Sequence, residues 1–199
     1  MSSQRIYIFK RFERFWHWTQ ALLIIAMLTT GFEIHGSYRL LGFKQAVGLH
    51  TAAAWALITL WVFAIFWHFT TGEWRQYVPT LKNADAMFRY YVLGIFTGAP
   101  HPFRATQLTK HNPLQRLAYL LVKLVINPLV WLSGLALLYY PAWRDAAGAP
   151  ALGSVALLHT IGAFMMLIFL VAHVYLATTG HTPLAHIKAM ITGWEEVEE

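Results

Sequence analysis

The chain of 199 residues has no cysteine and few charged residues. Without cysteine it can form no disulfide bond, hold no iron–sulfur cluster and attach no c-type haem. Charged residues make up 12% of the chain, well below the roughly 25% of a soluble domain. Hydrophobic residues make up 57%, and nine residues are tryptophan. The composition therefore argues against a soluble protein and predicts a chain that lies in a lipid bilayer.

Four apolar runs are long enough to cross a bilayer, for which roughly 20 residues suffice. They cover residues 15–34, 46–69, 113–140 and 152–178. The first run is long, rich in aromatic residues and without a small-residue cleavage site, so it predicts an uncleaved anchor rather than a signal peptide. We therefore predict one all-α domain over residues 1–199, built as a four-helix transmembrane bundle.

The positive charges indicate how this bundle is oriented. Lysine and arginine gather in the N-terminal tail and in the segment between the second and third runs, whereas the two other loops hold few. Since cytoplasmic loops of membrane proteins carry the excess of these residues, both termini should be cytoplasmic. In a membrane protein the net charge of +6 reflects this rule, and we predict no nucleic-acid partner.

The segments outside the runs contain further helix signals. Residues 85–96 predict an interfacial helix between the second and third transmembrane helices, with its aromatic face in the headgroups. Asn112 and Pro113 are typical of the N-cap and the first position of a helix, and Pro128 should kink the third helix in the middle of the membrane. Residues 184–194 predict a short amphipathic C-terminal helix along the cytoplasmic surface.

Four histidines inside the apolar runs are the candidates for function: His17, His50, His159 and His173. Ionisable groups at membrane depth are costly and mark functional sites. His159 and His173 are fourteen residues apart, which is a rise of roughly 21 Å and nearly a whole number of helical turns. The last helix therefore presents two imidazoles on nearly one face, one towards each side of the bilayer.

The direction of each helix sorts the histidines into two levels. With a cytoplasmic N-terminus, His17 lies level with His173 as an inner pair, and His50 lies level with His159 as an outer pair. Two neutral imidazoles from different helices are the usual axial ligands of a low-spin b-type haem, which carries electrons because no coordination position is open to substrate. We therefore predict two haem b groups, one at each level.

Small residues on the same helices support this interpretation. Gly31 lies fourteen residues after His17, and Ala64 lies fourteen after His50. Each helix thus offers a small side chain at the level of the other haem, where the edge of a macrocycle can pack. Gly162 in the last helix and a glycine at position 134 fit the same pattern.

Spacing alone leaves one alternative open. His68 lies eighteen residues after His50, on nearly the same face and at the inner level, so it could replace His17 or His173 as a ligand. The histidines outside the runs are expected to be solvated: His35, His101, His111, His181 and His186.

Several motifs accompany these histidines. They are Arg14-Phe-Trp-His-Trp18 with Thr30-Gly31 at the end of the same run, Gly48-Leu-His50, Arg89-Tyr-Tyr-Val-Leu-Gly94, Lys110-His-Asn-Pro-Leu-Gln115, Gly180-His-Thr-Pro183 and Lys188-Ala-Met-Ile-Thr-Gly193. With them the chain resembles, over nearly its whole length, the prokaryotic cytochrome b561-like dihaem subunits of respiratory complexes. These are the bacterial inner-membrane anchors of formate dehydrogenase-N, nickel–iron hydrogenases and thiosulfate reductases. The resemblance implies His17/His173 and His50/His159 as ligand pairs and leaves His68 without a ligand role.

The resemblance also implies a quinone site beside the inner haem. Asn112 matches the asparagine that lies near the quinone in the formate dehydrogenase relatives, and Gln115 follows one turn later. The chain departs from their pattern in two respects: Pro113 follows the asparagine, and Leu114 stands where those relatives have glycine. The alternative is that Asn112 serves only as the N-cap of its helix.

The implied function is that of a haem b subunit of a respiratory oxidoreductase complex, carrying electrons between a periplasmic partner and menaquinone or ubiquinone. The partner would be a molybdenum enzyme, a hydrogenase or a multihaem cytochrome c, and the substrate-specific catalytic residues would belong to it. Arg14, Arg39 or Lys188 could pair with haem propionates, and Lys123 is explained equally by snorkelling and by a role with propionates or protons.

Two alternatives remain. One is a stand-alone cytochrome b561 dimer that oxidises a small external reductant and reduces quinone. The other is a proton-coupled transporter, which four spans without an inverted repeat disfavour.

Overall fold

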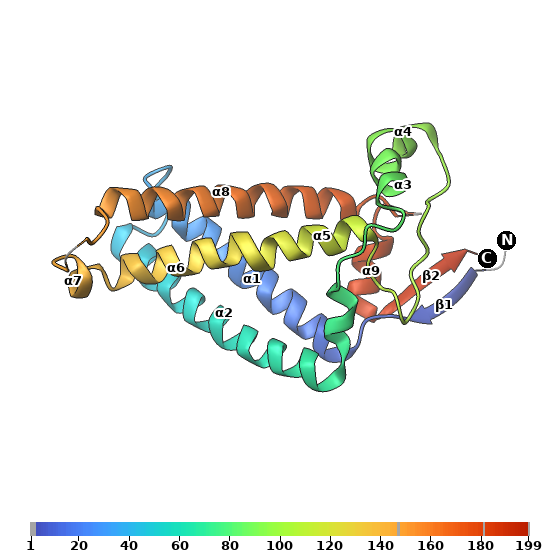
Figure 1. The fold of residues 1–199 in the computed structure, drawn as a ribbon, viewed down its shortest axis with the longest axis horizontal. Helices are drawn as coiled ribbons and strands as arrows, with labels where there is room; N and C mark the ends of the chain where they lie inside the picture. The colour runs from blue at the N-terminus through green and yellow to red at the C-terminus, as the bar shows by residue number, and fades with distance from the viewer. Residues whose placement is uncertain (1–2, 147, 181, 199) are drawn as a thin grey trace.

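The computed structural model describes residues 3–146, 148–180 and 182–198, and these residues are mostly helical. Four long helical stretches account for most of the molecule (Figure 1). They are α1 (Arg11–Ile34), α2 (Phe43–Thr71), the continuous α5–η3–α6 (Pro113–Leu121, Val122–Ile126 and Asn127–Leu138) and α8 (Leu152–Ala177). Each stretch coincides with one of the predicted apolar runs.

Among the described residues, three of these stretches have the length and apolar composition needed to cross a membrane: α2, Pro113–Leu138 and α8. The remaining helix, α1, has 24 residues, but Arg11, Glu13 and Arg14 lie in its first turn and Glu33 lies in its last. Between these charged ends, residues 15–32 carry no charge but include His17, Gln20 and three threonines. These polar side chains make α1 less apolar than the other three stretches, so it does not belong to this group by composition. The structure thus confirms a helix at all four predicted spans and a membrane-spanning composition at three of them.

The third stretch begins at a capping box and changes its winding before a proline. The Oδ1 atom of Asn112 accepts a hydrogen bond from the backbone N–H of Gln115, and Oε1 of Gln115 accepts one from the backbone N–H of Asn112, both at 2.9 Å. Pro113 occupies the first helical position, where its missing N–H loses no helical hydrogen bond. Pro128 has no N–H for the carbonyl four residues before it, and the helix widens into the π-helical turn η3 just ahead of it.

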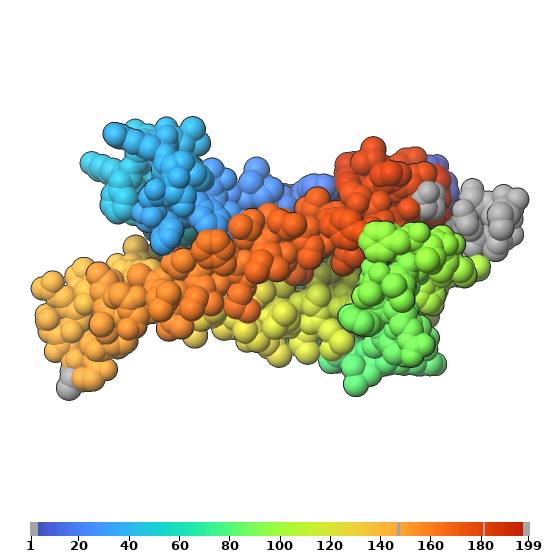
Figure 2. Space-filling model, turned by 90° about the horizontal axis from the view of Figure 1, so that it is seen from above, coloured from blue at the N-terminus to red at the C-terminus, as the bar shows by residue number. Residues whose placement is uncertain are grey.

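The long helices pack as two pairs. α1 packs along α2, and α6 packs along α8, whereas direct contacts between α1 and α8 are few. Aromatic side chains bridge the pairs: Trp61 of α2 stacks on Trp131 of α6 with ring centres 4.2 Å apart, and Phe32 of α1 meets Phe164 of α8 at 5.3 Å. Seen from above, α8 runs obliquely across the middle of the molecule (Figure 2). Side chains rather than close backbone contact therefore join α8 to α1.

Short helices connect α2 to α5. They are η1 (Glu73–Tyr77), α3 (Ala84–Arg89), η2 (Tyr90–Gly94) and α4 (Ile95–Thr97). The last three follow one another without a break and confirm a helix in the region predicted for residues 85–96. At the opposite end of the molecule, α7 (Tyr140–Trp143) follows α6 in the connection to α8 (Figure 1).

The first and last described segments of the chain lie side by side, at what we call the terminal end of the molecule; the opposite end is the far end (Figure 1). β1 (Ser3–Tyr7) pairs there with β2 (Trp194–Glu198) in an antiparallel sheet. Helix α9 (Ala185–Thr192) precedes β2 and confirms the short C-terminal helix expected from the sequence. The all-α prediction missed the sheet, because two short segments from opposite ends of the sequence form it.

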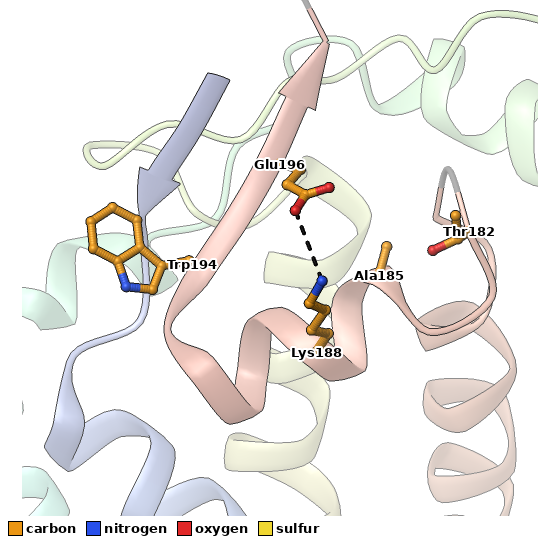
Figure 3. A pocket seen from close by; sticks show the side chains of 5 residues that line it. All are labelled: Thr182, Ala185, Lys188, Trp194 and Glu196. Carbon is orange, nitrogen blue, oxygen red and sulfur yellow. Dashed lines mark ion pairs between the residues drawn. The ribbon is translucent and has the colours of Figure 1, made fainter. Parts of the chain in front are cut away.

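Ion pairs join these terminal elements. Arg5 and Glu196 face each other across the sheet, with their charged groups 3.3 Å apart. Lys188 of α9 makes a second ion pair with Glu196 at 3.9 Å (Figure 3). Opposite charges directly across a strand pair stabilise a sheet by roughly 0.2–1 kcal/mol, so these contacts contribute modestly to holding the terminal segments together.

Candidate functional site

The structure brings four histidines together as two pairs. Near the terminal end, the ring centre of His17 on α1 lies 6.0 Å from that of His173 on α8. Towards the far end, the ring of His50 on α2 lies 6.1 Å from that of His159 on α8. All four side chains are half-buried. The inner and outer levels that follow from helix direction thus each hold two facing imidazoles.

The spacing within each pair suits a metal ion between two imidazoles. Two metal–imidazole bonds of about 2.0–2.1 Å each, together with the radii of the two rings, place the ring centres about 6 Å apart. Among the described residues there is no group of three or more His, Cys, Asp or Glu side chains that could hold a metal ion, whereas a bare zinc ion takes at least three protein ligands. Iron in a porphyrin needs only two ligands from the protein, because the macrocycle supplies the others.

Hydroxyl groups of neighbouring helices hold the outer rings through their second nitrogen. The Nδ1 atom of His50 lies 3.0 Å from Oγ1 of Thr30, and Nδ1 of His159 lies 3.0 Å from Oγ of Ser133. Thr30 is 2% exposed and Ser133 is 6% exposed, so water does not compete for either bond. Sequence reasoning missed both hydroxyls as functional groups. The one signal it offered is that a glycine follows each of them.

These two glycines make room for the outer rings. A Cβ atom at Gly31 would lie 3.3 Å from Cε1 of His50, and one at Gly134 would lie 3.1 Å from Cε1 of His159. The sequence pattern predicted a macrocycle edge beside these glycines, and the structure shows an imidazole ring there. Gly162, which was expected to face a macrocycle as well, instead faces α6, where an added Cβ would lie 2.6 Å from a side chain. It allows close helix packing.

Comparison with known proteins identifies the family. The family model described as prokaryotic cytochrome b561 matches residues 8–193. The chain belongs to this family. The putative cytochrome YdhU of Escherichia coli is 33% identical to it over 199 residues, which cover 96% of this chain and 75% of the relative.

Two further relatives are probable Ni/Fe-hydrogenase B-type cytochrome subunits, from Cupriavidus necator and Rhizobium leguminosarum. Each is 24% identical to the chain, and the alignments cover 88% and 89% of it and 80% and 82% of the relatives. No solved structure shows a significant match. Membership of the family makes the chain a membrane haem b protein of electron transport, in agreement with the resemblance found in the sequence.

The surroundings of the inner pair also fit a haem b. The Nε atom of Arg14, three residues before His17, is buried without a hydrogen-bond partner among the described residues, while its Nη1 donates to a backbone carbonyl of α9 at 2.6 Å. A guanidinium N–H is well suited to a carboxylate such as a haem propionate. Of the other propionate partners expected from the sequence, Arg39 is exposed after α1 and Lys188 pairs with Glu196.

His68, the alternative inner ligand, lies apart from both pairs. Its side chain is 7% exposed, and its Nδ1 lies 2.6 Å from the carbonyl oxygen of Ala64. The ring packs against Trp16 at 5.1 Å and Tyr77 at 5.4 Å, and in the described part of the chain no other histidine ring contacts it. The geometry therefore gives His68 no second imidazole with which to hold iron.

The other histidines differ in their surroundings. Three are exposed, as expected from the sequence: His35, His101 and His186. His181 lies outside the described residues. His111 was predicted to be solvated, and this is wrong: its ring packs between Tyr77 at 5.3 Å and Tyr119 at 5.1 Å. Burial lowers the pKa of His111 to about 3, so its ring is neutral at physiological pH.

Lys123 contacts the same aromatic cluster. Its Nζ lies 3.4 Å from the centre of the Tyr77 ring, a distance that indicates a cation–π interaction. Tyr77 belongs to η1 at the terminal end, so the lysine reaches out of the apolar middle of its helix. This is the snorkelling that the sequence left as one of two explanations.

Asn112 and Gln115 build the start of α5. Besides the capping box, Nδ2 of Asn112 donates to the hydroxyl oxygen of Tyr91 at 2.9 Å, and Asn112 is only 2% exposed. The amide of Asn112 thus ties η2 to α5. Burial raises the pKa of Tyr91, so its hydroxyl keeps the proton and can donate a hydrogen bond of its own.

A buried ion network, which sequence reasoning did not identify, lies at the terminal end. Nζ of Lys110 is 2.7 Å from the carboxylate of Glu13 and 2.9 Å from that of Glu73, and Nζ of Lys10 is 2.6 Å from the other oxygen of Glu73. The side chains of Lys110 and Glu13 are 3% and 7% exposed. Burial alone would raise the pKa of Glu73, but hydrogen bonds from Lys10 and Lys110 lower it below its usual value. The network ties α1 to the segment before α5.

The close packing of Gly134 against His159 leads to a test. In the Gly134→Val variant the new methyl groups should displace the ring of His159, and the affinity for a haem held by that ring should fall by about tenfold or more. A pyridine haemochrome assay after purification should then show less haem per chain than in the wild type. Gly153→Val is the matched control on α8, because nothing lies within 4 Å of its added Cβ. Equal haem content in the two variants would contradict the packing argument.

Proposed function

We propose that this cytochrome binds one haem b at each histidine pair and carries electrons across the bacterial inner membrane, between a periplasmic redox subunit and the quinone pool. The observation that carries the proposal is the facing of His17 with His173 at 6.0 Å and of His50 with His159 at 6.1 Å. The two histidines of each pair would hold one haem, which would supply a one-electron carrier.

In this proposal α1 completes a four-helix transmembrane bundle with the three apolar spans. Its charged first turn lies at the terminal end, where Glu13 pairs with Lys110 and Arg14 donates to the backbone of α9, so these charges need not enter lipid. The short helices between α2 and α5 and helix α9 would lie along the cytoplasmic interface. The concentration of Lys and Arg in the same segments supports cytoplasmic termini.

Residues of the chain would then set the distance between the two haems and the surroundings of each. His159 and His173 stand on one rigid helix, roughly 21 Å apart along its axis, and this separates the two levels. The contact between Phe164 and Phe32 comes from the part of α8 between those levels and keeps it apolar. The unpartnered Nε of Arg14 would bind an inner propionate.

For the quinone, menaquinone or ubiquinone, we place the site beside the inner pair at the start of α5. Asn112 and Gln115 hold this start in place through their capping box. The hydroxyl of Tyr91, oriented by Nδ2 of Asn112, can donate a hydrogen bond to a quinone carbonyl. The asparagine thus acts through the tyrosine, since its own amide is engaged.

The names of two relatives as hydrogenase cytochrome subunits support a complex with a catalytic subunit. We propose that this partner docks at the far end, near the outer pair, and that it is a molybdenum enzyme, a hydrogenase or a multihaem cytochrome c. The partner would carry the substrate-specific chemistry.

Purification in mild detergent should then recover a larger redox subunit with the cytochrome. Recovery of a dimer of this chain alone, reduced by a small external reductant and oxidised by quinone, would make it a stand-alone cytochrome b561.

Anaerobic addition of a reduced menaquinol analogue to the purified cytochrome should reduce its haem, as followed by stopped-flow absorbance in the b-type α band. The His173→Ala variant should lose this reaction, because quinol would enter at the inner level. The His50→Ala variant is the matched control and should keep an inner haem that is reduced at the wild-type rate. If quinol does not reduce the wild-type protein, the quinone role is wrong. If His173→Ala reacts like the wild type, the site lies elsewhere.

A further inference from the structure

Thr30 and Ser133 occupy equivalent places around the outer pair. Thr30 on α1 meets the ring of His50 on α2, and Ser133 on α6 meets the ring of His159 on α8, each at 3.0 Å. The helix pairs α1–α2 and α6–α8 therefore present the same contact twice, once for each outer imidazole. A contact repeated on both ligands of one site, from two different helices, points to a role at that site.

Each hydroxyl has already used its own hydrogen within its helix. Oγ1 of Thr30 donates to the carbonyl of Ala26 at 2.7 Å, and Oγ of Ser133 donates to the carbonyl of Leu129. A hydroxyl has one hydrogen to donate and accepts further bonds through its lone pairs. The ring nitrogen Nδ1 is therefore the donor in both outer histidines, and a backbone carbonyl accepts from the same ring beside the hydroxyl, that of Met27 for His50 and that of Val130 for His159. This leaves Nε2 of each ring unprotonated and available to iron.

The inner pair lacks this contact. Among the described residues, Nδ1 of His17 is buried without a hydrogen-bond partner, and none forms a hydrogen bond to the ring of His173. The ring of His173 instead stacks on Phe169, with ring centres 5.7 Å apart. The two levels therefore share the same type of ligand but differ in what holds it.

We infer that Thr30 and Ser133 are positioning residues that fix the protonated nitrogen of the outer ligands and lower the reduction potential of the outer haem. The inference rests on the haem ligation proposed above. Donation of the Nδ1 hydrogen to an oxygen makes the imidazole a more basic ligand, and a more basic ligand stabilises oxidised iron over reduced iron. The hydrogen bonds around the ligand thus adjust the outer site without changing the ligand.

The test is a spectroelectrochemical titration of the purified cytochrome with both haems bound. In the Thr30→Val/Ser133→Ala double variant, the ratio of reduced to oxidised outer haem at a fixed potential should rise about tenfold, which is 59 mV for a one-electron couple. The inner midpoint should stay where it is, and the His50→Ala variant, which keeps only the inner haem, identifies it. The low-spin ferric EPR signal of the outer haem should change in the same double variant.

Two further variants separate the hydrogen bond from general packing. Thr29→Val/Thr59→Val is the matched control, because these hydroxyls also bond the carbonyl four residues back but contact no histidine among the described residues. It should leave both midpoints unchanged. Thr30→Ser/Ser133→Thr keeps a hydroxyl at each place and should restore the wild-type midpoint.

The inference is overturned if the reduction potential of the outer haem does not change in the double variant, or if it changes equally in the Thr29→Val/Thr59→Val control. Neither result would contradict the proposed haem ligation. A wild-type protein that holds no haem at the outer level shows instead that the proposed function is wrong. The single variants Thr30→Val and Ser133→Ala each keep one hydroxyl and should each give part of the shift. If neither single variant changes the reduction potential of the outer haem, the inference is wrong. The single variants decide this even if the double variant loses its outer haem and cannot be titrated.

Discussion

Alanine at any one of His17, His50, His159 or His173 is expected to reduce the haem content from about two per chain to about one, whereas His68→Ala should keep both. Each of the four provides one of the two bonds between the protein and an iron in the proposed arrangement, and without it the remaining single bond holds the group weakly. A pyridine haemochrome assay on protein purified from cells with ample haem supply measures the result. The loss should be confined to the level of the altered histidine.

Added imidazole provides a control for folding in these variants. A free imidazole fits the space left by the missing ring and should restore part of the lost haem in the His50→Ala variant, which a misfolded protein would not show. The two levels should also be independent, so that His17→Ala combined with His50→Ala removes both haems. If His68→Ala loses a haem while His173→Ala keeps two, the inner ligand assignment is wrong.

Replacing Lys110 by methionine should strongly destabilise the protein. The lysine contacts Glu13 and Glu73 at 2.7 and 2.9 Å, and its side chain is 3% exposed. Removing one partner of a buried ion pair leaves an uncompensated buried charge, at a cost of about 3–5 kcal/mol. For a chain of this size that is a fall in the thermal midpoint of roughly 6–20 °C, measurable in detergent by the loss of helical circular dichroism.

Lys188→Met is the matched control, since the side chain of Lys188 is 62% exposed and its ion pair with Glu196 spans 3.9 Å. An exposed pair contributes about 0–1 kcal/mol, so the midpoint should change little. Glu73 keeps its ion pair with Lys10 in this variant, so adding Glu13→Gln to Lys110→Met removes the carboxylate that has lost its partner and should recover part of the stability. The buried network would have no structural role if Lys110→Met melted at the temperature of Lys188→Met.

Much of the arrangement of helices could be predicted from the sequence, because a run of apolar residues forms a helix of known rise per residue. The positions of His159 and His173 along one helix follow directly from that rise. Which of His68 and His173 faces His17 does not follow, because spacing puts both near the inner level. The structure distinguishes them: the ring of His68 packs against Trp16 and that of His173 meets His17.

Other parts of the site could not be predicted for a physical reason. Thr30 and Ser133 look like ordinary helical residues in the sequence, since a hydroxyl that bonds the carbonyl four residues back is common in helices. Their contact with the outer rings depends on which helices are neighbours and how each is rotated. The same holds for His111, which a loop position predicts to be solvated but which two tyrosines enclose.

By itself the sequence determined the membrane character, the long helices and the level of each histidine, because composition and helix geometry act within a single segment of chain. Only the tertiary structure decided which hydroxyls hold the outer rings, that the terminal segments pair as strands, and that Lys110 reaches Glu13 across 97 residues of sequence. Each of these contacts joins residues from separate elements. Their meeting depends on helix packing and side-chain rotamers, which no local pattern records.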